Sequence, residues 1–192
     1  MNSSDFFDDN IQYFPGFLCE QESTSLFLNL TKQIPFEQNH IFIFGRWRPE
    51  PRLSAWVGDA HCFYRYSGLD RTPLPWSDEL LLLRRKIENF TQRRFNCVLI
   101  NLYRNGADGM GWHSDDEPEL GQGAEIASLS LGEKRRFRLR RKVDKYSMGM
   151  DLESGSLLWM KPGVQETWEH QVPKSIRNLG ARLNLTFRYI AC

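Results

Sequence analysis

The sequence lacks a long hydrophobic run. Its longest unbroken aliphatic stretch, Leu80 to Leu83, is far shorter than the roughly 20 apolar residues that cross a membrane. The first nine residues contain three aspartates, whereas a secretory signal is basic and then apolar. We therefore expect an intracellular protein, cytoplasmic in a bacterium and nuclear in a eukaryote. The 192 residues, 41% hydrophobic and 26% charged, are typical of one soluble domain that spans residues 1–192.

Cysteine is scarce and net charge is almost absent. The four cysteines are far apart and fit no C-x-x-C pattern, which excludes a zinc ribbon and favours free, mostly buried thiols.

Lys and Arg number 25 against 24 Asp and Glu, but residues 1–50 carry a local charge of −4 and residues 51–192 one of +5. Within residues 134–142, seven of nine side chains are basic. The small net charge is therefore compatible with a polyanionic partner.

Hydrophobic periodicity predicts helices early in the chain and strands later. Two apolar stripes at helical spacing predict helices over 23–34 and 77–93, the second with Ser77 as its N-cap. After residue 94 the pattern changes to short extended runs separated by turns that contain glycine. These predicted strands lie at 95–103, 124–131, 134–142, 156–160 and 181–190. The order indicates an α+β fold with an antiparallel sandwich or jelly roll at its centre.

The last predicted strand has one polar face. Leu183, Leu185 and Phe187 share one side, so four polar residues share the other. These four residues are Arg182, Asn184, Thr186 and Arg188. Such a face is compatible with simple exposure to solvent, and equally with two guanidinium groups that hold an anion inside a barrel.

Three residues form a candidate metal site. His113 and Asp115 are two positions apart, so they point to the same side of an extended segment and could chelate one ion. His170 could supply a third ligand. Two imidazoles and one carboxylate leave neighbouring positions open, as in non-haem Fe(II) oxygenases. An H-x-D tripeptide is common by chance, but Arg182, twelve residues after His170, could bind a dicarboxylate. This combination outlines a 2-oxoglutarate-dependent dioxygenase.

The sequence resembles the AlkB family of nucleic-acid dealkylating dioxygenases, and in particular its duplex-DNA-acting branch. The resemblance is strongest over residues 97–188, where the chain contains Asn101-Leu-Tyr103, His113-Ser-Asp115, His170 and a final Asn-Leu-Thr-Phe-Arg188. It implies a double-stranded β-helix (jelly-roll) core at about 95–190, with N-terminal helices and a nucleotide-recognition lid at about 40–70.

The resemblance also implies the ligands of the site. Fe(II) would be held by His113, Asp115 and His170, and the cosubstrate 2-oxoglutarate would bind beside it. Its distal carboxylate would be held by Arg182 with Tyr103 and Asn184. The remaining cosubstrate residues would be Asn101 and Arg188, near the metal-chelating end, and Thr186.

Residues 43–66 contain aromatic side chains interleaved with arginines, as in surfaces that stack on bases and contact phosphates. They are equally compatible with an amphipathic cover over the barrel. The resemblance implies a finger that fills the gap left by a flipped base, formed by Ile43, Phe44 and Gly45, and a DNA contact by Arg52 in the lid. The residues expected around the substrate base are Tyr64, Tyr66, Asp116 and Glu117.

The chemistry implied is oxidative demethylation of bases such as 1-methyladenine and 3-methylcytosine in DNA. The reaction would use Fe(II) as cofactor and consume O2 and 2-oxoglutarate. It would release formaldehyde, succinate and CO2, and ascorbate would activate the enzyme in vitro. Because these bases are cationic, Asp116 and Glu117 could face their charge, although a solvated acidic turn would look the same in sequence. Alternatives are the same chemistry on RNA or etheno adducts, an oxygenase of proteins or small molecules, and a non-catalytic nucleic-acid-binding β-barrel.

The predicted partner is DNA, single-stranded or duplex, bound by a monomer. Some side chains of 134–142 are expected to contact the nucleic-acid backbone, although a solvated edge strand would also be basic. The duplex-acting branch has a long basic insertion after the equivalent of Lys142 and three consecutive basic residues after its last iron ligand. Here both are missing, which weakens the expectation of a strong duplex preference.

Overall fold

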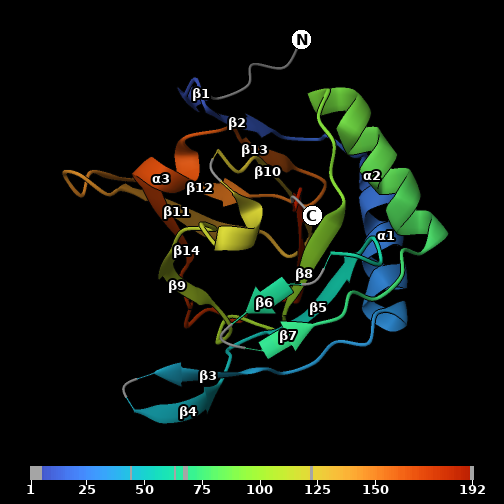
Figure 1. Ribbon diagram of the computed structural model, residues 1–192, viewed down its shortest axis with the longest axis horizontal. Coiled ribbons are helices and arrows are strands. Elements are labelled where there is room, and N and C mark those ends of the chain that lie inside the picture. Colours follow the sequence, from blue (N-terminus) through green and yellow to red (C-terminus); the bar gives the residue numbers. More distant parts are fainter. Residues whose placement is uncertain (1–5, 44, 63, 67–68, 122, 191–192) are drawn as a thin grey trace.

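The computed structural model describes residues 6–43, 45–62, 64–66, 69–121 and 123–190. Two antiparallel sheets face each other, and two helices cover the outer face of the larger sheet (Figure 1). The helices are α1 (Glu20–Gln33) and α2 (Asp78–Thr91), close to the ranges that the periodicity predicts. Ser77 is the N-cap of α2, since its hydroxyl accepts a hydrogen bond from the Leu80 amide at 3.3 Å. No helix that the structure describes is long and apolar enough to cross a membrane.

The large sheet contains seven strands. In spatial order they are β1 (Phe6–Asp8), β2 (Ile11–Phe14), β13 (Leu157–Met160), β10 (Ile126–Gly132), β15 (Arg182–Arg188), β8 (Cys97–Tyr103) and β5 (Leu53–Gly58). The four-stranded sheet has the order β12 (Ser147–Leu152), β11 (Arg135–Arg141), β14 (Trp168–Val172) and β9 (Met110–His113). Sequence-distant strands are therefore neighbours in both sheets, as in a jelly roll.

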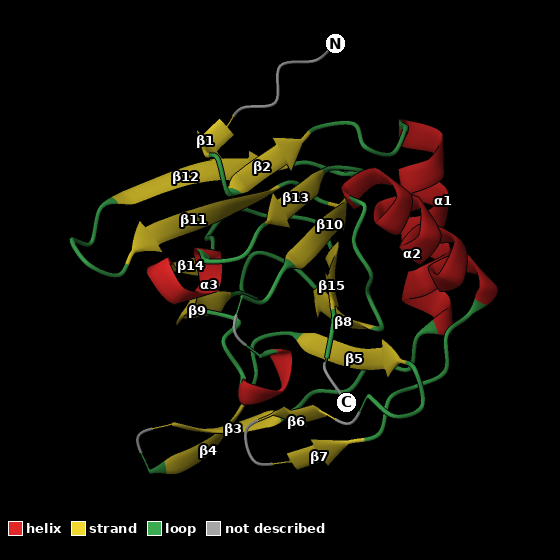
Figure 2. Cartoon of the chain, turned by 45° about the horizontal axis from the view of Figure 1, so that its top comes forward, coloured by secondary structure: helices red, strands yellow, loops and turns green. Residues whose placement is uncertain are grey.

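Two hairpins and two short helical turns complete the described chain. The hairpins are β3 (His40–Ile43) with β4 (Arg46–Pro49), and β6 (Tyr64–Tyr66) with β7 (Leu69–Arg71). The turns are α3 (Val164–Thr167), which leads into β14, and a 3-10 turn over Pro118–Leu120. The β3–β4 hairpin projects from the body in both views of the molecule (Figures 1 and 2).

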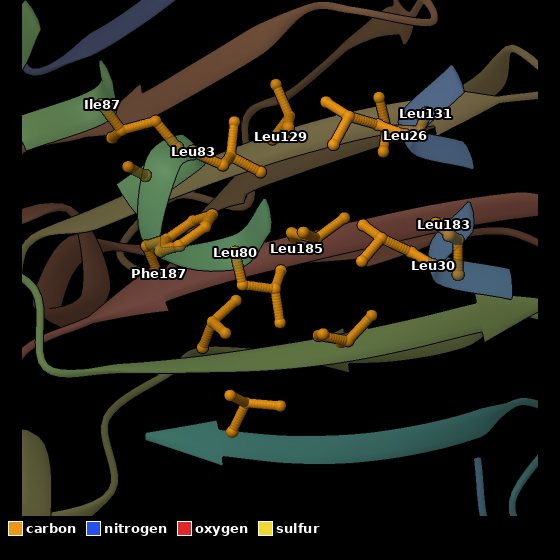
Figure 3. Close-up of a cluster of buried hydrophobic side chains, with 14 of the residues drawn as sticks. Leu26, Leu30, Leu80, Leu83, Ile87, Leu129, Leu131, Leu183, Leu185 and Phe187 are labelled. Carbon is orange, nitrogen blue, oxygen red and sulfur yellow. The ribbon is translucent and has the colours of Figure 1, made fainter. Parts of the chain in front are cut away.

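The two faces of β15 have different environments. Leu183, Leu185 and Phe187 pack under α1 and α2, against Leu30, Leu83 and further buried aliphatic residues (Figure 3). The polar residues on the opposite face point into the sandwich and are at most 9% exposed. The interpretation of an exposed polar face is thereby wrong, because the four-stranded sheet covers it with a second apolar cluster that includes Phe137 and Leu139.

Ten of the described strands lie outside the five predicted ranges: β1 to β7, β9, β12 and β14. The sequences of β9 and β12 each contain glycine and few β-branched residues, so their propensity for strand is low. They form because neighbouring strands offer a hydrogen-bonding edge. Gly149 of β12 also makes room for a side chain, since a Cβ there would lie 2.8 Å from the Arg136 guanidinium. Cys62 and Cys97 are buried, with thiols that donate to the carbonyls of Asn96 and Arg188, and Cys19 is exposed.

We predict that Leu185→Ala lowers the free energy of unfolding by about 2–5 kcal/mol, because it leaves a cavity in the fully buried layer between β15 and the helices. Chemical denaturation followed by circular dichroism measures the change. Leu82→Ala is the control, since Leu82 lies on α2 with 64% of its surface exposed and should change stability by less than about 0.5 kcal/mol. Equal losses for the two variants would contradict this packing.

Candidate metal centre

The three predicted metal ligands lie together at one edge of the four-stranded sheet. β9 and β14 are antiparallel neighbours, and their register places His113 opposite His170 with ring centroids 4.2 Å apart. Asp115 lies two residues after the end of β9. Its carboxylate oxygens lie 3.7 Å from His113 Nε2 and 3.8 Å from His170 Nε2. One candidate ligand atom from each residue lies within 4.8 Å of the others, so the cluster could hold a single metal ion.

Hydrogen bonds and packing orient the two imidazoles. His113 Nδ1 lies 2.8 Å from the carbonyl oxygen of Gly111, which leaves Nε2 facing Asp115. The His170 ring is 6% exposed and packs against Phe137, with ring centroids 5.4 Å apart. Burial, followed by the charge of His113, lowers the pKa of His170 to about 3. His170 is therefore neutral at physiological pH, the form of imidazole that coordinates metals.

Asp115 is a buried carboxylate held in place from both sides. Burial by itself would raise its pKa, but the opposing effects of Arg188 and the two histidines lower the pKa to about 2. Arg188 Nη2 lies 3.0 Å from Asp115 Oδ1. On the other side, the Asp115 amide donates to Gln165 Oε1 at 3.0 Å. The carboxylate is thus ionised, and its backbone is tied to the segment that leads to His170.

A buried arginine at the other end of β15 has free donors. Arg182 is 1% exposed and pairs across the sheet with Tyr103, whose ring centroid lies 5.3 Å from the guanidinium carbon. Its Nη2 donates to Ser130 Oγ at 2.9 Å, whereas Nε and Nη1 have no hydrogen-bond partner among the described residues. Burial lowers the pKa of Arg182 to about 10, so it remains charged at neutral pH. A buried cation with unused donors fits a carboxylate ligand.

The metal cluster and the polar residues border one cavity of about 130 Å³. Arg182 adjoins it through the lining residue Tyr103. Five of the predicted cosubstrate residues line this cavity together with the three metal ligands: Asn101, Tyr103, Asn184, Thr186 and Arg188. The metal ligands and a set of polar side chains therefore line the same small cavity.

The structure separates the two acidic residues expected around the substrate base. Glu117 lines the cavity, and its carboxylate lies 3.7 Å from Arg188 Nη1. Asp116 is 63% exposed at its side chain, lies outside the cavity lining, and pairs with Lys142 at 3.5 Å. The prediction for Asp116 therefore disagrees with its position, because consecutive residues of this turn point in different directions.

The predicted lid residues have mixed outcomes. Arg52 is 4% exposed, and its Nε donates to Asn101 Oδ1 at 2.9 Å, so the expected DNA contact disagrees with its burial. Phe44 lies outside the described residues. The same holds for the side chains of Ile43, Tyr64 and Tyr66. Gly45 lies in the hairpin turn, immediately before β4. Its φ of +73° is a conformation that favours glycine.

The basic segment 134–142 is largely neutralised within the molecule. Arg135 is buried and donates to the backbone carbonyls of Asn105, Asp108 and Pro173. Among the described residues, Arg138 has no acidic partner and lies over the Trp112 ring. The remaining five basic residues of the segment form ion pairs: Lys134–Glu153, Arg136–Asp151, Arg140–Glu169, Arg141–Asp144 and Lys142–Asp116. The contact of some side chains of this segment with a nucleic-acid backbone stays a prediction.

The sequence matches a model of the 2OG-Fe(II) oxygenase superfamily over residues 10–188. It is 39% identical over 186 residues to alpha-ketoglutarate-dependent dioxygenase alkB homolog 3 of Bos taurus, an alignment that covers 92% of this chain and 64% of that protein. It is 37% identical over 180 residues to DNA oxidative demethylase ALKBH2 of Mus musculus, with coverage of 88% and 75%. The chain belongs to the AlkB family.

The AlkB fold extends over nearly the whole chain. A solved structure described as OsALKBH1 superposes with a TM-score of 0.72 at 17% identity, covering 97% of this chain and 100% of that one. At this identity the likeness concerns the fold alone. The chain spans 64% of the length of the Bos taurus relative. The family resemblance predicted from the sequence motifs is thereby confirmed.

The described residues fit the two groups after which the superfamily is named. Two imidazoles and one carboxylate at mutual contact distance suit Fe(II), and the unused donors of Arg182 suit a carboxylate of 2-oxoglutarate. Sequence reasoning missed Ser130, Gln165 and Glu50, which support this site from other strands and loops, and it gave Arg52 a different role. Supporting polar residues of this kind carry no signal until their neighbours are known.

We predict that Asp115→Ala weakens binding of Mn(II), a stable substitute for Fe(II), by more than about 100-fold, since loss of a supporting contact alone typically costs 10–100-fold. Isothermal titration calorimetry measures the dissociation constant. His40→Ala is the matched control, because His40 is exposed on β3 and outside the cluster. Unchanged Mn(II) affinity in the Asp115 variant would show that the metal binds elsewhere.

Proposed function

We propose that this chain is an Fe(II)/2-oxoglutarate-dependent dioxygenase that removes alkyl groups oxidatively from bases such as 1-methyladenine and 3-methylcytosine in DNA. One observation carries the proposal: the His113, Asp115 and His170 cluster and the donor-rich region around Arg182 adjoin the same small cavity. The proposal is supported by the relative from Mus musculus, which is named a DNA oxidative demethylase. The products would be the repaired base, formaldehyde, succinate and CO2.

The cofactor and cosubstrate would occupy adjacent parts of the cavity. His113, Asp115 and His170 would hold Fe(II), and Arg182 with Tyr103 and Asn184 would bind the distal carboxylate of 2-oxoglutarate. Asn101 and Arg188 would lie near its metal-chelating end, and Thr186 would line the same pocket. When bound, the iron supplies the activation of O2 that couples decarboxylation of 2-oxoglutarate to oxidation of the alkyl group. The residues of the chain bind and orient both small molecules.

Glu117 supplies a negative charge for an N-alkylated base. Its carboxylate lines the cavity and is about one-fifth exposed, so a base that enters from solvent could meet it. Alkylation at a Watson–Crick nitrogen makes the base cationic, and a partly desolvated carboxylate attracts a cation more strongly than an exposed one does. We assign this role to Glu117 and none to Asp116. The base would have to leave the helical stack to reach the cavity.

The β3–β4 hairpin supports a nucleic-acid partner. Phe42 and Trp47 pair across this hairpin with ring centroids 5.4 Å apart, and each is 60% exposed. Arg46 and Arg48 are exposed on the same strand as Trp47. Exposed aromatic rings beside arginines are typical of surfaces that stack on bases and contact phosphates. We propose that this hairpin is part of the nucleotide-recognition lid.

The charge distribution favours single-stranded DNA, or both forms, over duplex DNA alone. Most basic residues of 134–142 have acidic partners, so few cations remain for a complementary strand. A single strand also costs less energy to splay, because its bases are not paired.

A turnover assay on matched substrates tests the proposal. With Fe(II), 2-oxoglutarate and ascorbate, the protein should restore adenine in a single-stranded DNA carrying 1-methyladenine and release formaldehyde, both detectable by mass spectrometry. Duplex DNA and RNA of the same sequence run in parallel, and repair of RNA alone would redirect the assignment to RNA. A metal-loaded protein that binds the oligonucleotide but never converts it would contradict catalysis and favour a binding module.

We predict that Arg182→Met raises the half-saturating concentration of 2-oxoglutarate by roughly 100-fold, because two charge-assisted hydrogen bonds to its carboxylate are lost. Methionine is apolar and of similar length, so the buried position stays filled. Steady-state kinetics measure the change, and fluorescence anisotropy measures the affinity for the oligonucleotide, which should stay within about twofold. A defect confined to oligonucleotide affinity would overturn the role of Arg182.

A further inference from the structure

A buried ion pair lies between the β3–β4 hairpin and the cavity. Arg52 Nη2 is 3.1 Å from Glu50 Oε1, and the two side chains are 4% and 1% exposed. Both residues are in the segment that joins β4 to β5. Arg52 Nε donates in turn to the side-chain oxygen of Asn101 at 2.9 Å. One guanidinium therefore connects a buried carboxylate with a residue that lines the cavity.

This contact determines which way the Asn101 amide faces. An arginine side chain donates hydrogen bonds and accepts none, so only the amide oxygen of Asn101 can face it. The amide NH2 group is consequently directed away from Arg52. Asn101 lies on β8 opposite Asn184 of β15, within the polar lining of the cavity. The contact with Arg52 thus makes Asn101 a donor toward the cavity, which suits a carboxylate and disfavours a cation.

Glu50 is fixed in place by its backbone. Its amide donates to the Asn39 carbonyl at 2.8 Å, and its own carbonyl accepts from Gln38 Nε2 at 3.0 Å. The adjacent Pro51 carbonyl accepts from the Gly109 amide at 2.9 Å, just before β9. The backbone that bears the Glu50 carboxylate is therefore hydrogen-bonded both to the residues that precede β3 and to the loop that precedes β9.

Stability alone gives a weak reason for this pair. Removing two charges from water is costly, and well-packed apolar residues in place of a buried ion pair are often as stable or more stable. Arg52 also presents its Nε, rather than only the end of its guanidinium, to Asn101. This geometry suits a guanidinium that holds the Asn101 side chain in one orientation.

We propose that Arg52, held by Glu50, is a positioning residue that orients the Asn101 amide for the carboxylate at the metal-chelating end of 2-oxoglutarate. This inference rests on the proposed function, because it takes 2-oxoglutarate as the ligand of the cavity. It also replaces the DNA contact expected for Arg52 with a role in cosubstrate binding. Arg52 acts through Asn101 and does not itself line the cavity.

The test is a double-mutant cycle on 2-oxoglutarate binding by the Mn(II)-loaded protein, measured by calorimetry without nucleic acid. Arg52→Met and Asn101→Ala should each weaken binding about tenfold, which corresponds to about 1.4 kcal/mol. If Arg52 acts through Asn101, the double variant should bind no more weakly than Asn101→Ala alone. Arg84→Met is the control, since Arg84 pairs with Asp59 and Glu88 away from the cavity and should leave binding unchanged.

A second readout separates orientation from general loss of structure. In ¹⁵N-labelled protein, the side-chain NH2 resonances of Asn101 should shift when 2-oxoglutarate is added, and Arg52→Met should reduce that shift while the resonances of Asn29 stay in place. Asn29 is the control because it lies on α1 and contacts Glu79. If Arg52→Met fails to fold, Glu50→Gln keeps the shape, removes the charge that holds Arg52, and should weaken binding severalfold.

The outcomes distinguish the two proposals. Failure of the unsubstituted protein to bind 2-oxoglutarate would overturn the proposed function and this inference with it. Normal binding by the unsubstituted protein and equal binding by the Arg52 and Glu50 variants would overturn the positioning role alone. Additive losses in the double variant would likewise show that Arg52 acts independently of Asn101.

Discussion

The cost of burying charge inside a β-sandwich is the constraint on which this structure depends. Arg182, Arg188 and Asp115 all lie in the interior, where a charge without partners is strongly disfavoured. The two sheets must therefore bring opposite charges or hydrogen-bonding groups together at defined positions. Because β15 has polar residues on one face and apolar residues on the other, it can do this and still pack against α1 and α2.

The buried arginines differ in how many of their guanidinium nitrogens have hydrogen-bond or ion-pair partners. Their roles differ accordingly. Arg135 donates to three backbone carbonyls and joins two loops. Arg188 lies beside Asp115 and Glu117, and Arg52 lies between Glu50 and Asn101. Arg182 keeps two nitrogen atoms without a partner among the described residues. With two such atoms, Arg182 marks the place for an anionic ligand, whereas the other arginines shape its surroundings.

Local charge density was a poor guide to the surface. Residues 134–142 suggest a binding strip when counted along the chain, yet antiparallel neighbours place acidic residues beside two of the arginines. Asp151 of β12 faces Arg136, and Glu169 of β14 faces Arg140. Acidic residues on neighbouring strands can neutralise a run of positive charge, and the sequence of the basic segment alone does not reveal them.

The sequence by itself determined the alternation of β15, the helical stripes under which it packs, and the His113–Asp115 pair, because these are patterns of period two or three to four along one segment. The family motif strengthened the case for His170 and added Tyr103, Asn101 and Asn184 as cosubstrate residues. Only the tertiary structure decided that Asp116 lies outside the cavity, that Arg52 is buried against Asn101, and that Arg182 has unused donors. The last two depend on contacts between residues at least 49 positions apart, and such contacts are set by strand order and register rather than by local propensity.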